Sequence, residues 1–141
     1  MASKRAYLDH LRNVPLFTAC TNKELETIAR ATDEITLPAG HVLTDQGQTG
    51  REAFIIVDGS ATVRRNGKKV ATLGKGAVVG ELSLLDHGPR TATVTTDSDT
   101  TVLVIEQRHF LGVLEDVPAL ARKLLATLAG RIREFDRQYY G

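Results

Sequence analysis

The sequence predicts a domain that is mainly β with flanking helices, an α+β fold. Residues 33–106 are dense in Val, Ile and Thr, and turn residues such as Gly, Pro and Asn interrupt them about every 8–12 residues. The segments on both sides instead place apolar residues three or four positions apart, as amphipathic helices do. Many short strands at this spacing indicate a sandwich, jelly roll or barrel rather than a parallel sheet.

Length and composition are those of one globular domain. The chain has 141 residues, of which 42% are hydrophobic and 25% charged, and its formal net charge is +1. These values exclude wholesale disorder and a fibrous repeat, and a protein that binds mainly phosphate backbones would be far more basic. We expect residues 1–141 to form a single domain, with helices within 3–31, strands within 33–106 and helices within 107–140.

Two local signals predict where particular elements begin or turn. Thr21 and Glu24 form a capping box, in which each side chain bonds the backbone amide of the other, so a helix should begin here. Asn66 and Gly67 tolerate the positive φ angles of a type I′ turn. They predict a tight hairpin between residues 61–64 and 69–73.

A long helix is predicted towards the C-terminus. Pro118 suits a first helical turn, where its missing N–H costs nothing. Apolar residues then recur three or four positions apart almost to the last residue: Leu120, Leu124, Leu128, Ile132, Phe135 and Tyr139. This stripe extends over about five turns, more than one covering helix needs. We therefore expect it also to contact a ligand or another subunit.

One segment, residues 80–94, interrupts the strand pattern and carries the chemistry. Gly80 permits close backbone approach where a strand stops, and residues 81–85 can form one helical turn whose free amides attract an anion. Arg90 and Thr91 add a forked cation and a hydroxyl, so the set fits a phosphate. Glu81 can accept a hydrogen bond from a nearby hydroxyl. A phosphate site beside a hydroxyl acceptor indicates a nucleotide with its ribose. The alternative is a surface turn with a solvated ion pair.

This segment resembles the phosphate-binding cassette of the cyclic nucleotide-binding domain family. The resemblance extends over about residues 14–135. Its other matching positions are glycine turns and core strands: Phe17, Gly40, Gln46-Gly47, Phe54-Ile55-Ile56-Val57, Gly59 and Gly76. The resemblance implies an eight-stranded antiparallel β-roll, or jelly roll, over residues 33–106. It also implies N-terminal helices, a short cassette helix and a long C-terminal helix.

The resemblance implies which residues hold the phosphate and ribose. Arg90 and the amides around Ser83 would hold the cyclic phosphate, and Glu81 would accept the ribose 2′-hydroxyl. The full set matched to the cassette is Gly80, Glu81, Leu82, Ser83, Arg90, Thr91 and Ala92. Ser83 stands where the family usually has alanine and adds a hydroxyl near the phosphate.

Recognition of the base is implied for residues outside the cassette. Val63 and Val70 match positions that form an apolar wall beside the base, and Arg131 matches an arginine that reaches towards the cassette glutamate. Phe135 stands where the bacterial activator branch offers a small hydroxyl residue to adenine, so its ring would stack on the purine instead.

The expected ligand is cAMP, with cGMP as the alternative. Thr91 is compatible with either nucleotide, and the resemblance to the activator branch favours cAMP. Which aromatic residue caps the base is left open among Phe135, Tyr139 and Tyr140. The alternative role for all three is packing within the helix or across a dimer.

The implied function is regulatory binding without turnover, with no cofactor, no metal and no enzymatic activity. Phosphodiester hydrolysis needs a metal cluster or an activated nucleophile, whereas the histidines are scattered, at His10, His41, His87 and His109, and Cys20 is the single cysteine. One alternative is a fragment or relative of a cAMP-responsive transcription regulator. A cupin-like metal enzyme of jelly-roll fold is the other.

The expected partners are the nucleotide and either an effector protein or a second copy bound through the C-terminal helix. DNA is not expected as a partner, because the basic excess of that helix is modest. No apolar run approaches the roughly 20 residues that cross a bilayer. We therefore expect a cytoplasmic protein with no membrane partner.

Overall fold

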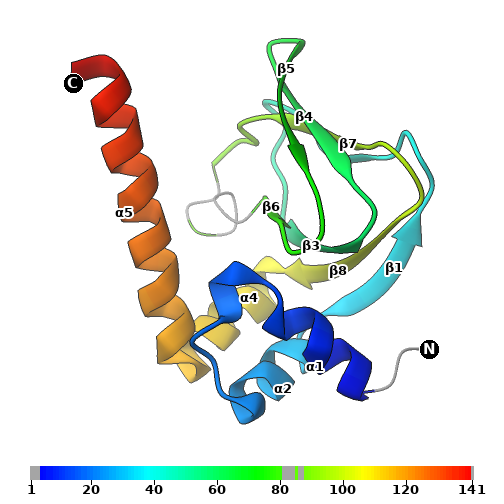
Figure 1. The fold of residues 1–141 in the computed structure, drawn as a ribbon, viewed down its shortest axis with the longest axis vertical. Helices are drawn as coiled ribbons and strands as arrows, with labels where there is room; N and C mark the ends of the chain where they lie inside the picture. The colour runs from blue at the N-terminus through cyan, green and yellow to red at the C-terminus, as the bar shows by residue number, and fades with distance from the viewer. Residues whose placement is uncertain (1–3, 81–84, 86–87, 141) are drawn as a thin grey trace.

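The computed structural model describes residues 4–80, 85 and 88–140, and it has the predicted α+β fold (Figure 1). The helices are α1 (Lys4–Arg12), the 3-10 helix η1 (Pro15–Phe17), α2 (Asn22–Arg30), α4 (Gln107–Asp116) and α5 (Pro118–Tyr140). The strands are β1 (Asp33–Leu37), β2 (Val42–Thr44), β3 (Glu52–Asp58), β4 (Ala61–Arg65), β5 (Lys68–Leu73), β6 (Val78–Val79), β7 (Thr93–Thr96) and β8 (Thr100–Glu106). The cassette helix expected within residues 81–85 falls on positions of which only residue 85 is described.

The strands form two antiparallel sheets, as the predicted β-roll requires. One sheet has the order β1-β8-β3-β6 and the other β2-β7-β4-β5, with four strands in each. Side chains from both sheets meet in one apolar cluster: Leu43, Phe54, Ile56, Ala61, Val63, Val79, Ala92, Val94 and Val102. This cluster holds the two sheets together and forms the floor beneath the site described below.

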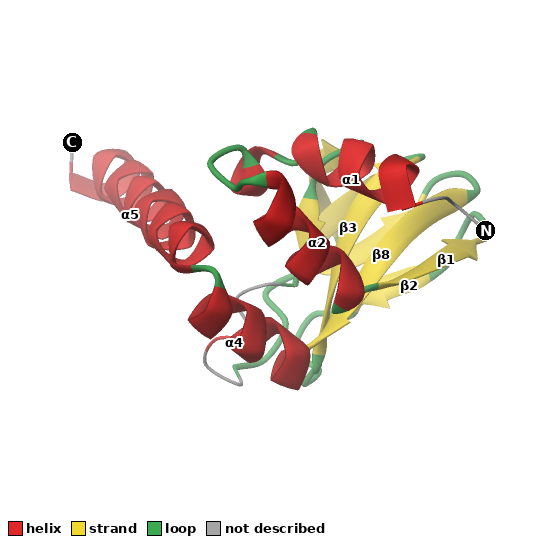
Figure 2. Cartoon of the chain, turned by 90° about the horizontal axis from the view of Figure 1, so that it is seen from below, coloured by secondary structure: helices red, strands yellow, loops and turns green. Residues whose placement is uncertain are grey.

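A layer of helices covers the outer face of β3 and β8 (Figure 2). A second, larger apolar cluster joins these strands to α1, η1, α2, α4 and the first turns of α5. Leu11, Leu25 and Leu120 are each at most 1% exposed within it. The helices therefore share one core with the strands that carry the site.

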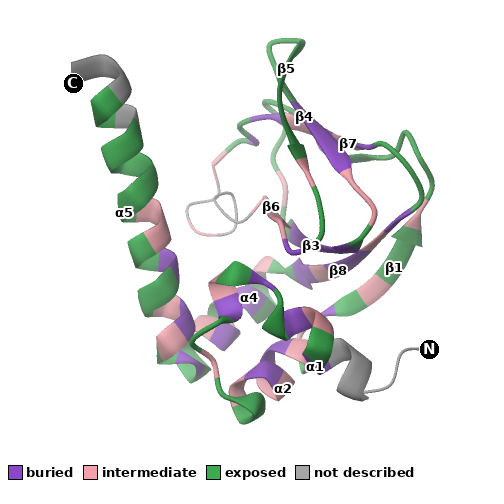
Figure 3. Ribbon diagram, viewed as in Figure 1, coloured by how far each residue is buried: buried purple, intermediate pink, exposed green. Residues whose placement is uncertain are grey.

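The central strand β3 is buried on both faces (Figure 3). Successive strand side chains point to opposite faces, so Phe54 and Ile56 enter the cluster between the sheets, while Ile55 and Val57 enter the cluster with the helices. No position between Ala53 and Val57 faces water, which explains the uninterrupted apolar run in the sequence.

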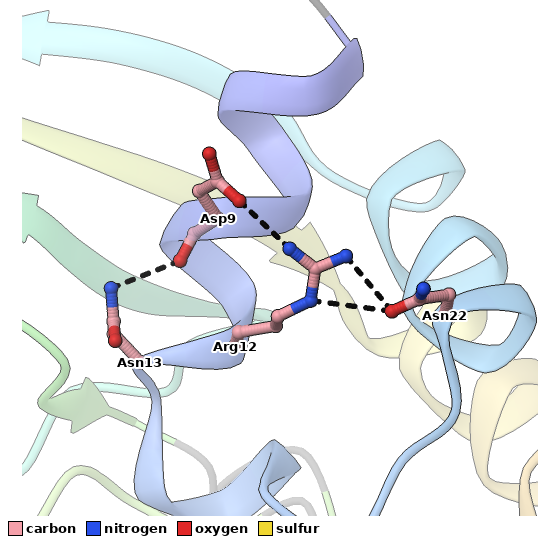
Figure 4. A network of polar contacts seen from close by, with 4 residues as sticks. All are labelled: Asp9, Arg12, Asn13 and Asn22. Atoms are coloured by element: carbon pink, nitrogen blue, oxygen red, sulfur yellow. Dashed lines mark hydrogen bonds and ion pairs between the residues drawn. The ribbon is translucent and has the colours of Figure 1, made fainter.

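Polar contacts fix the N-terminal helices to each other (Figure 4). The guanidinium of Arg12 donates to Asp9 Oδ1 at 2.8 Å and, through Nη2, to Asn22 Oδ1 at 2.9 Å. The capping box predicted at Thr21 is confirmed. The Thr21 hydroxyl accepts from the Glu24 amide at 3.2 Å, and Glu24 accepts from the Thr21 amide at 2.8 Å.

The hairpin predicted at Asn66-Gly67 is also confirmed. It joins β4 to β5, and both turn residues have positive φ angles, 52° at Asn66 and 78° at Gly67. These are the conformations that a type I′ turn needs, and a residue with a bulky side chain at Asn66 would resist them.

The long C-terminal helix begins at Pro118, as predicted, and the exposure of its predicted apolar stripe changes along its length. Leu120 and Leu124 are buried in the helical core, whereas Ile132 is 63% exposed. Leu125, which is not part of that stripe, is 66% exposed. Beyond its first turns α5 extends away from the other helices (Figures 1 and 3). Within the described part of the chain, every helix is too short or too polar to span a bilayer.

Candidate functional site

A cavity of about 420 Å³ lies beside the sheet β2-β7-β4-β5, where the hairpin β4–β5, the end of β6 and α5 come together. It is lined by Thr44, Val63, Arg65, Val70, Ala71, Leu73, Val78, Val79, Gly80, Arg90, Thr91, Ala92, Val94 and Arg131. The predicted site residues Gly80, Arg90, Thr91, Ala92, Val63, Val70 and Arg131 are therefore brought together. Glu81, Leu82 and Ser83 lie outside the described residues, as does the side chain of Phe135.

Arg90 is the charged residue buried at the inner end of this cavity, only 7% exposed. Its Nη1 donates to the backbone carbonyl of Gly80 at 3.1 Å, and its Nη2 donates to the carbonyl of Glu52 at 2.7 Å. None of the described carboxylates forms an ion pair with it. The guanidinium is thus held in place by neutral groups, and its charge is left to interact with an anion in the cavity.

Burial has an electrostatic consequence for Arg90. Loss of water around the guanidinium lowers the pKa of Arg90 below its ordinary value, and the negative charge of Glu52 offsets part of that shift. An arginine still keeps its proton at neutral pH. A buried positive charge is costly unless it is paired. Since Arg90 forms no ion pair with a carboxylate among the described residues, a bound anion would stabilise this arrangement.

Two glycines, Gly50 and Gly80, leave the space that the Arg90 side chain occupies. A Cβ atom at Gly50 would overlap the Arg90 guanidinium at Cζ, Nε and Nη2. A Cβ atom at Gly80 would collide with Nη1, and Gly80 also has a φ of +86°, which other residues rarely adopt. The guanidinium therefore occupies space that any larger residue at either position would take.

The backbone around Arg90 is fastened to the turn at residues 45–48. Gly47 donates its amide to the Arg90 carbonyl at 2.9 Å, and the Arg90 amide donates to the Gln48 carbonyl at 2.8 Å. The hydroxyl of the buried Thr44 donates to the Ala92 carbonyl at 3.0 Å. These bonds fix the direction in which Arg90 and its neighbours face the cavity.

The part of the lining that belongs to the hairpin β4–β5 is apolar except for Arg65. Val63 is 9% exposed and Val70 is 50% exposed, and both line the cavity with Ala71 and Leu73. Arg131 reaches the cavity from α5. An anionic group beside Arg90 and a flat apolar group beside the valines would both find complementary surroundings.

Several residues of the site were not anticipated from the sequence, among them Thr44, Arg65 and Gly50. Thr44 and Arg65 line the cavity, and Gly50 gives room to Arg90. Gly50 follows a Gln-Gly turn, but nothing local to it indicates Arg90 as its neighbour. The described residues include no group of three or more His, Cys, Asp or Glu side chains placed to hold a metal ion.

Comparison with known proteins identifies the family. Residues 34–117 match the family model described as "Cyclic nucleotide-binding domain". The chain belongs to this family. The cavity and Arg90 lie within the matched region, apart from the contribution of Arg131.

Two relatives of the chain have cyclic AMP in their names. The chain is 29% identical over 131 residues to the cyclic AMP receptor protein of Thermus thermophilus, with 89% of this chain and 61% of that protein covered. It is 33% identical over 144 residues to a cAMP-dependent protein kinase regulatory subunit of Mycosarcoma maydis, with 96% and 25% covered. The structure of the Thermus thermophilus catabolite activator protein has a TM-score of 0.82 at 30% identity, over 88% of this chain and 61% of that one. The chain thus spans less than two thirds of each of these relatives.

Gly50→Ala should weaken the binding of a cyclic nucleotide roughly tenfold to a hundredfold, because the added methyl displaces the guanidinium and removes a charge-assisted hydrogen bond. Gly74→Ala is the matched control, since a Cβ atom there has nothing within 4 Å. Titration with a fluorescent cyclic nucleotide measures both. Equal affinities in the two variants would contradict the packing of Arg90 described above.

Proposed function

We propose that this domain, residues 1–141, binds a cyclic nucleotide as a regulatory sensor without turning it over, and that it prefers cAMP to cGMP. The observation that carries the proposal is Arg90, a buried guanidinium that is held by two backbone carbonyls and faces a cavity with an apolar far wall. A cyclic phosphate supplies one negative charge for Arg90, and a purine supplies a flat apolar face for the wall.

The preference for cAMP is supported by the relatives rather than by a contact to the base. Both curated relatives compared above carry cyclic AMP in their names. The hairpin wall at Val63 and Val70 offers apolar contact, which favours no purine strongly. Thr91 is exposed and its hydroxyl is compatible with either nucleotide.

The remaining cassette residues take the roles that the family pattern implies. Glu81 accepts the ribose 2′-hydroxyl, the amides around Leu82 and Ser83 hold the phosphate, and Ala92 completes the phosphate shell. On α5, Arg131 reaches the cavity, which supports the helix as a lid, with Phe135 four residues further along for the base.

Ligand would then act by shifting an equilibrium between open and closed arrangements of α5. The first turns of α5 are buried through Leu120 and Leu124, and Arg131 lies two to three turns beyond them. Leu85, within the cassette, packs against the same helical core. A change at the cassette can therefore alter the packing beneath α5.

A cAMP-responsive transcription regulator is the second candidate. It is supported by the cyclic AMP receptor protein among the relatives, of which this chain covers 61%. A shift assay with duplex DNA at two salt concentrations, with and without cAMP, tests it. Retardation that requires cAMP would favour this candidate over a sensor that acts through a protein.

Arg90→Ala should weaken cAMP binding roughly thirtyfold to a few thousandfold, because truncating one partner of a desolvated charge pair costs about 2–5 kcal/mol. Arg90→Lys keeps the charge but loses the forked donor, so it should recover only part of the loss. Arg122→Ala, an exposed position on α5, is the control. Calorimetric titration that finds the same affinity in Arg90→Ala and wild type would overturn the site.

We also propose that a second copy of the chain packs on α5. Leu125 and Ile132 are seven residues apart, so they lie on one face of α5 as equivalent positions of a heptad do, and they are 66% and 63% exposed. A contiguous apolar patch on a helix face is a candidate interaction surface. An effector protein on the same face is the alternative partner.

Light scattering after size exclusion should give the wild type the mass of a dimer, and the double variant Leu125→Gln/Ile132→Gln the mass of one chain. Leu111→Gln on α4, where the side chain is 41% exposed, should leave the mass unchanged. A wild type that stays monomeric at high micromolar concentration would rule out self-association through α5.

A further inference from the structure

The tip of the hairpin β4–β5 extends past the rest of its sheet. β4 pairs with β7 from Ala61, opposite Thr96, to Arg64, opposite Thr93. β5 is an edge strand that pairs only with β4. Among the described strands, none therefore pairs with residues 65–68 from outside the hairpin. Figure 1 shows this tip at the end of the sheet that is far from α1, α2 and α4.

The side chains of the tip repel one another. Arg64 lies opposite Lys69 and Arg65 lies opposite Lys68, so two like-charged pairs face each other across the hairpin. Like charges in cross-strand pairs destabilise a hairpin, and all four residues are exposed. The position of the tip must therefore be maintained by contacts from outside the hairpin.

Gln46 supplies such a contact. Its side-chain Nε2 donates to Asn66 Oδ1 at 3.0 Å, and its Oε1 accepts from the Asn66 backbone amide at 2.8 Å. Both functional atoms of the glutamine amide are thus bonded to one residue of the turn, 20 positions away in the sequence. Because two hydrogen bonds join Gln46 to Asn66, they fix the orientation of the turn as well as its distance from Gln46.

The backbone of Gln46 is itself tied to the strand that follows Arg90. The Gln46 amide donates to Thr93 Oγ1 at 3.0 Å, and the Thr93 hydroxyl donates to Asp45 Oδ1 at 3.0 Å. The adjacent Gly47 amide bonds the Arg90 carbonyl. Gln46 therefore connects the segment that carries the phosphate-binding arginine to the hairpin on the other side of the cavity.

We propose that Gln46 is a positioning residue for nucleotide recognition, which fixes the hairpin β4–β5 as the wall beside the base. The hairpin contributes Val63, Arg65, Val70, Ala71 and Leu73 to the cavity. The proposal rests on the proposed function, since it assigns the base to this wall and the phosphate to Arg90. Gln46 itself does not line the cavity, so it acts through the hairpin and not by touching ligand.

The test compares two ligands that differ only in the base. In Gln46→Ala, cAMP should bind about three- to tenfold more weakly, the loss expected for two exposed hydrogen bonds that hold a wall in place. Ribose 3′,5′-cyclic phosphate, which has no base, should bind wild type and variant equally, because Arg90 keeps its backbone contacts. Competition against a fluorescent cyclic nucleotide measures both affinities.

Two further variants separate positioning from a general effect. Gln48→Ala is the matched control, because Gln48 is an exposed glutamine of the same turn that contributes only backbone bonds among those found. Asn66→Gly removes the side-chain acceptor and suits the positive φ there. The losses in Gln46→Ala and Asn66→Gly should not add in the double variant. Unchanged cAMP affinity in Gln46→Ala, or an equal loss for both ligands, would overturn the proposal.

A measurement without ligand tests the positioning role of Gln46 independently of whether the protein binds cAMP. Amide hydrogen exchange at Asn66 should be faster in Gln46→Ala than in wild type, because its acceptor is gone, and unchanged in Gln48→Ala. Equal exchange in all three proteins would overturn the positioning role whatever the ligand. Absence of cAMP binding to wild type would instead overturn the proposed function.

Discussion

Burying the guanidinium of Arg90 against backbone carbonyls imposes requirements at three positions, which lie in two segments of the chain. β3 must begin where the Glu52 carbonyl can accept, and the residue that follows β6 must tolerate the φ of Gly80. The turn before β3 must leave the space at Gly50 empty. Each requirement is met by a residue chosen for its backbone or its small size, so the charge is positioned without a described carboxylate that would compete with a ligand.

The same strand that supports Arg90 also joins the two cores. β3 has Phe54 and Ile56 in the cluster between the sheets and Ile55 and Val57 in the cluster with the helices. Because protein interiors are closely packed, a displacement of β3 or of the cassette changes the packing of both clusters. Through β3 the fold thereby connects the Glu52 carbonyl that holds Arg90 with the helical core on which the first turns of α5 pack.

Local signals in the sequence predicted the elements well, because each depends on residues close in the chain. The capping box at Thr21, the turn at Asn66 and the start of α5 at Pro118 all lie where predicted. The site was predicted through Arg90 and its resemblance to a family pattern. Gly50 was missed because its importance comes from a side chain 40 positions away, and periodicity carries no information about such a contact.

Calorimetric titration of the wild-type protein with cAMP and cGMP shows whether Arg90 and the hairpin wall together recognise a cyclic nucleotide. We expect saturable binding of one cAMP per chain, with cGMP binding more weakly at the same site and displaced by cAMP. Linear 5′-AMP, whose phosphate carries more charge and a different shape, should bind much more weakly than either. Absence of heat with both cyclic nucleotides, in a protein shown to be folded, would mean that Arg90 and the hairpin do not form a cyclic nucleotide site.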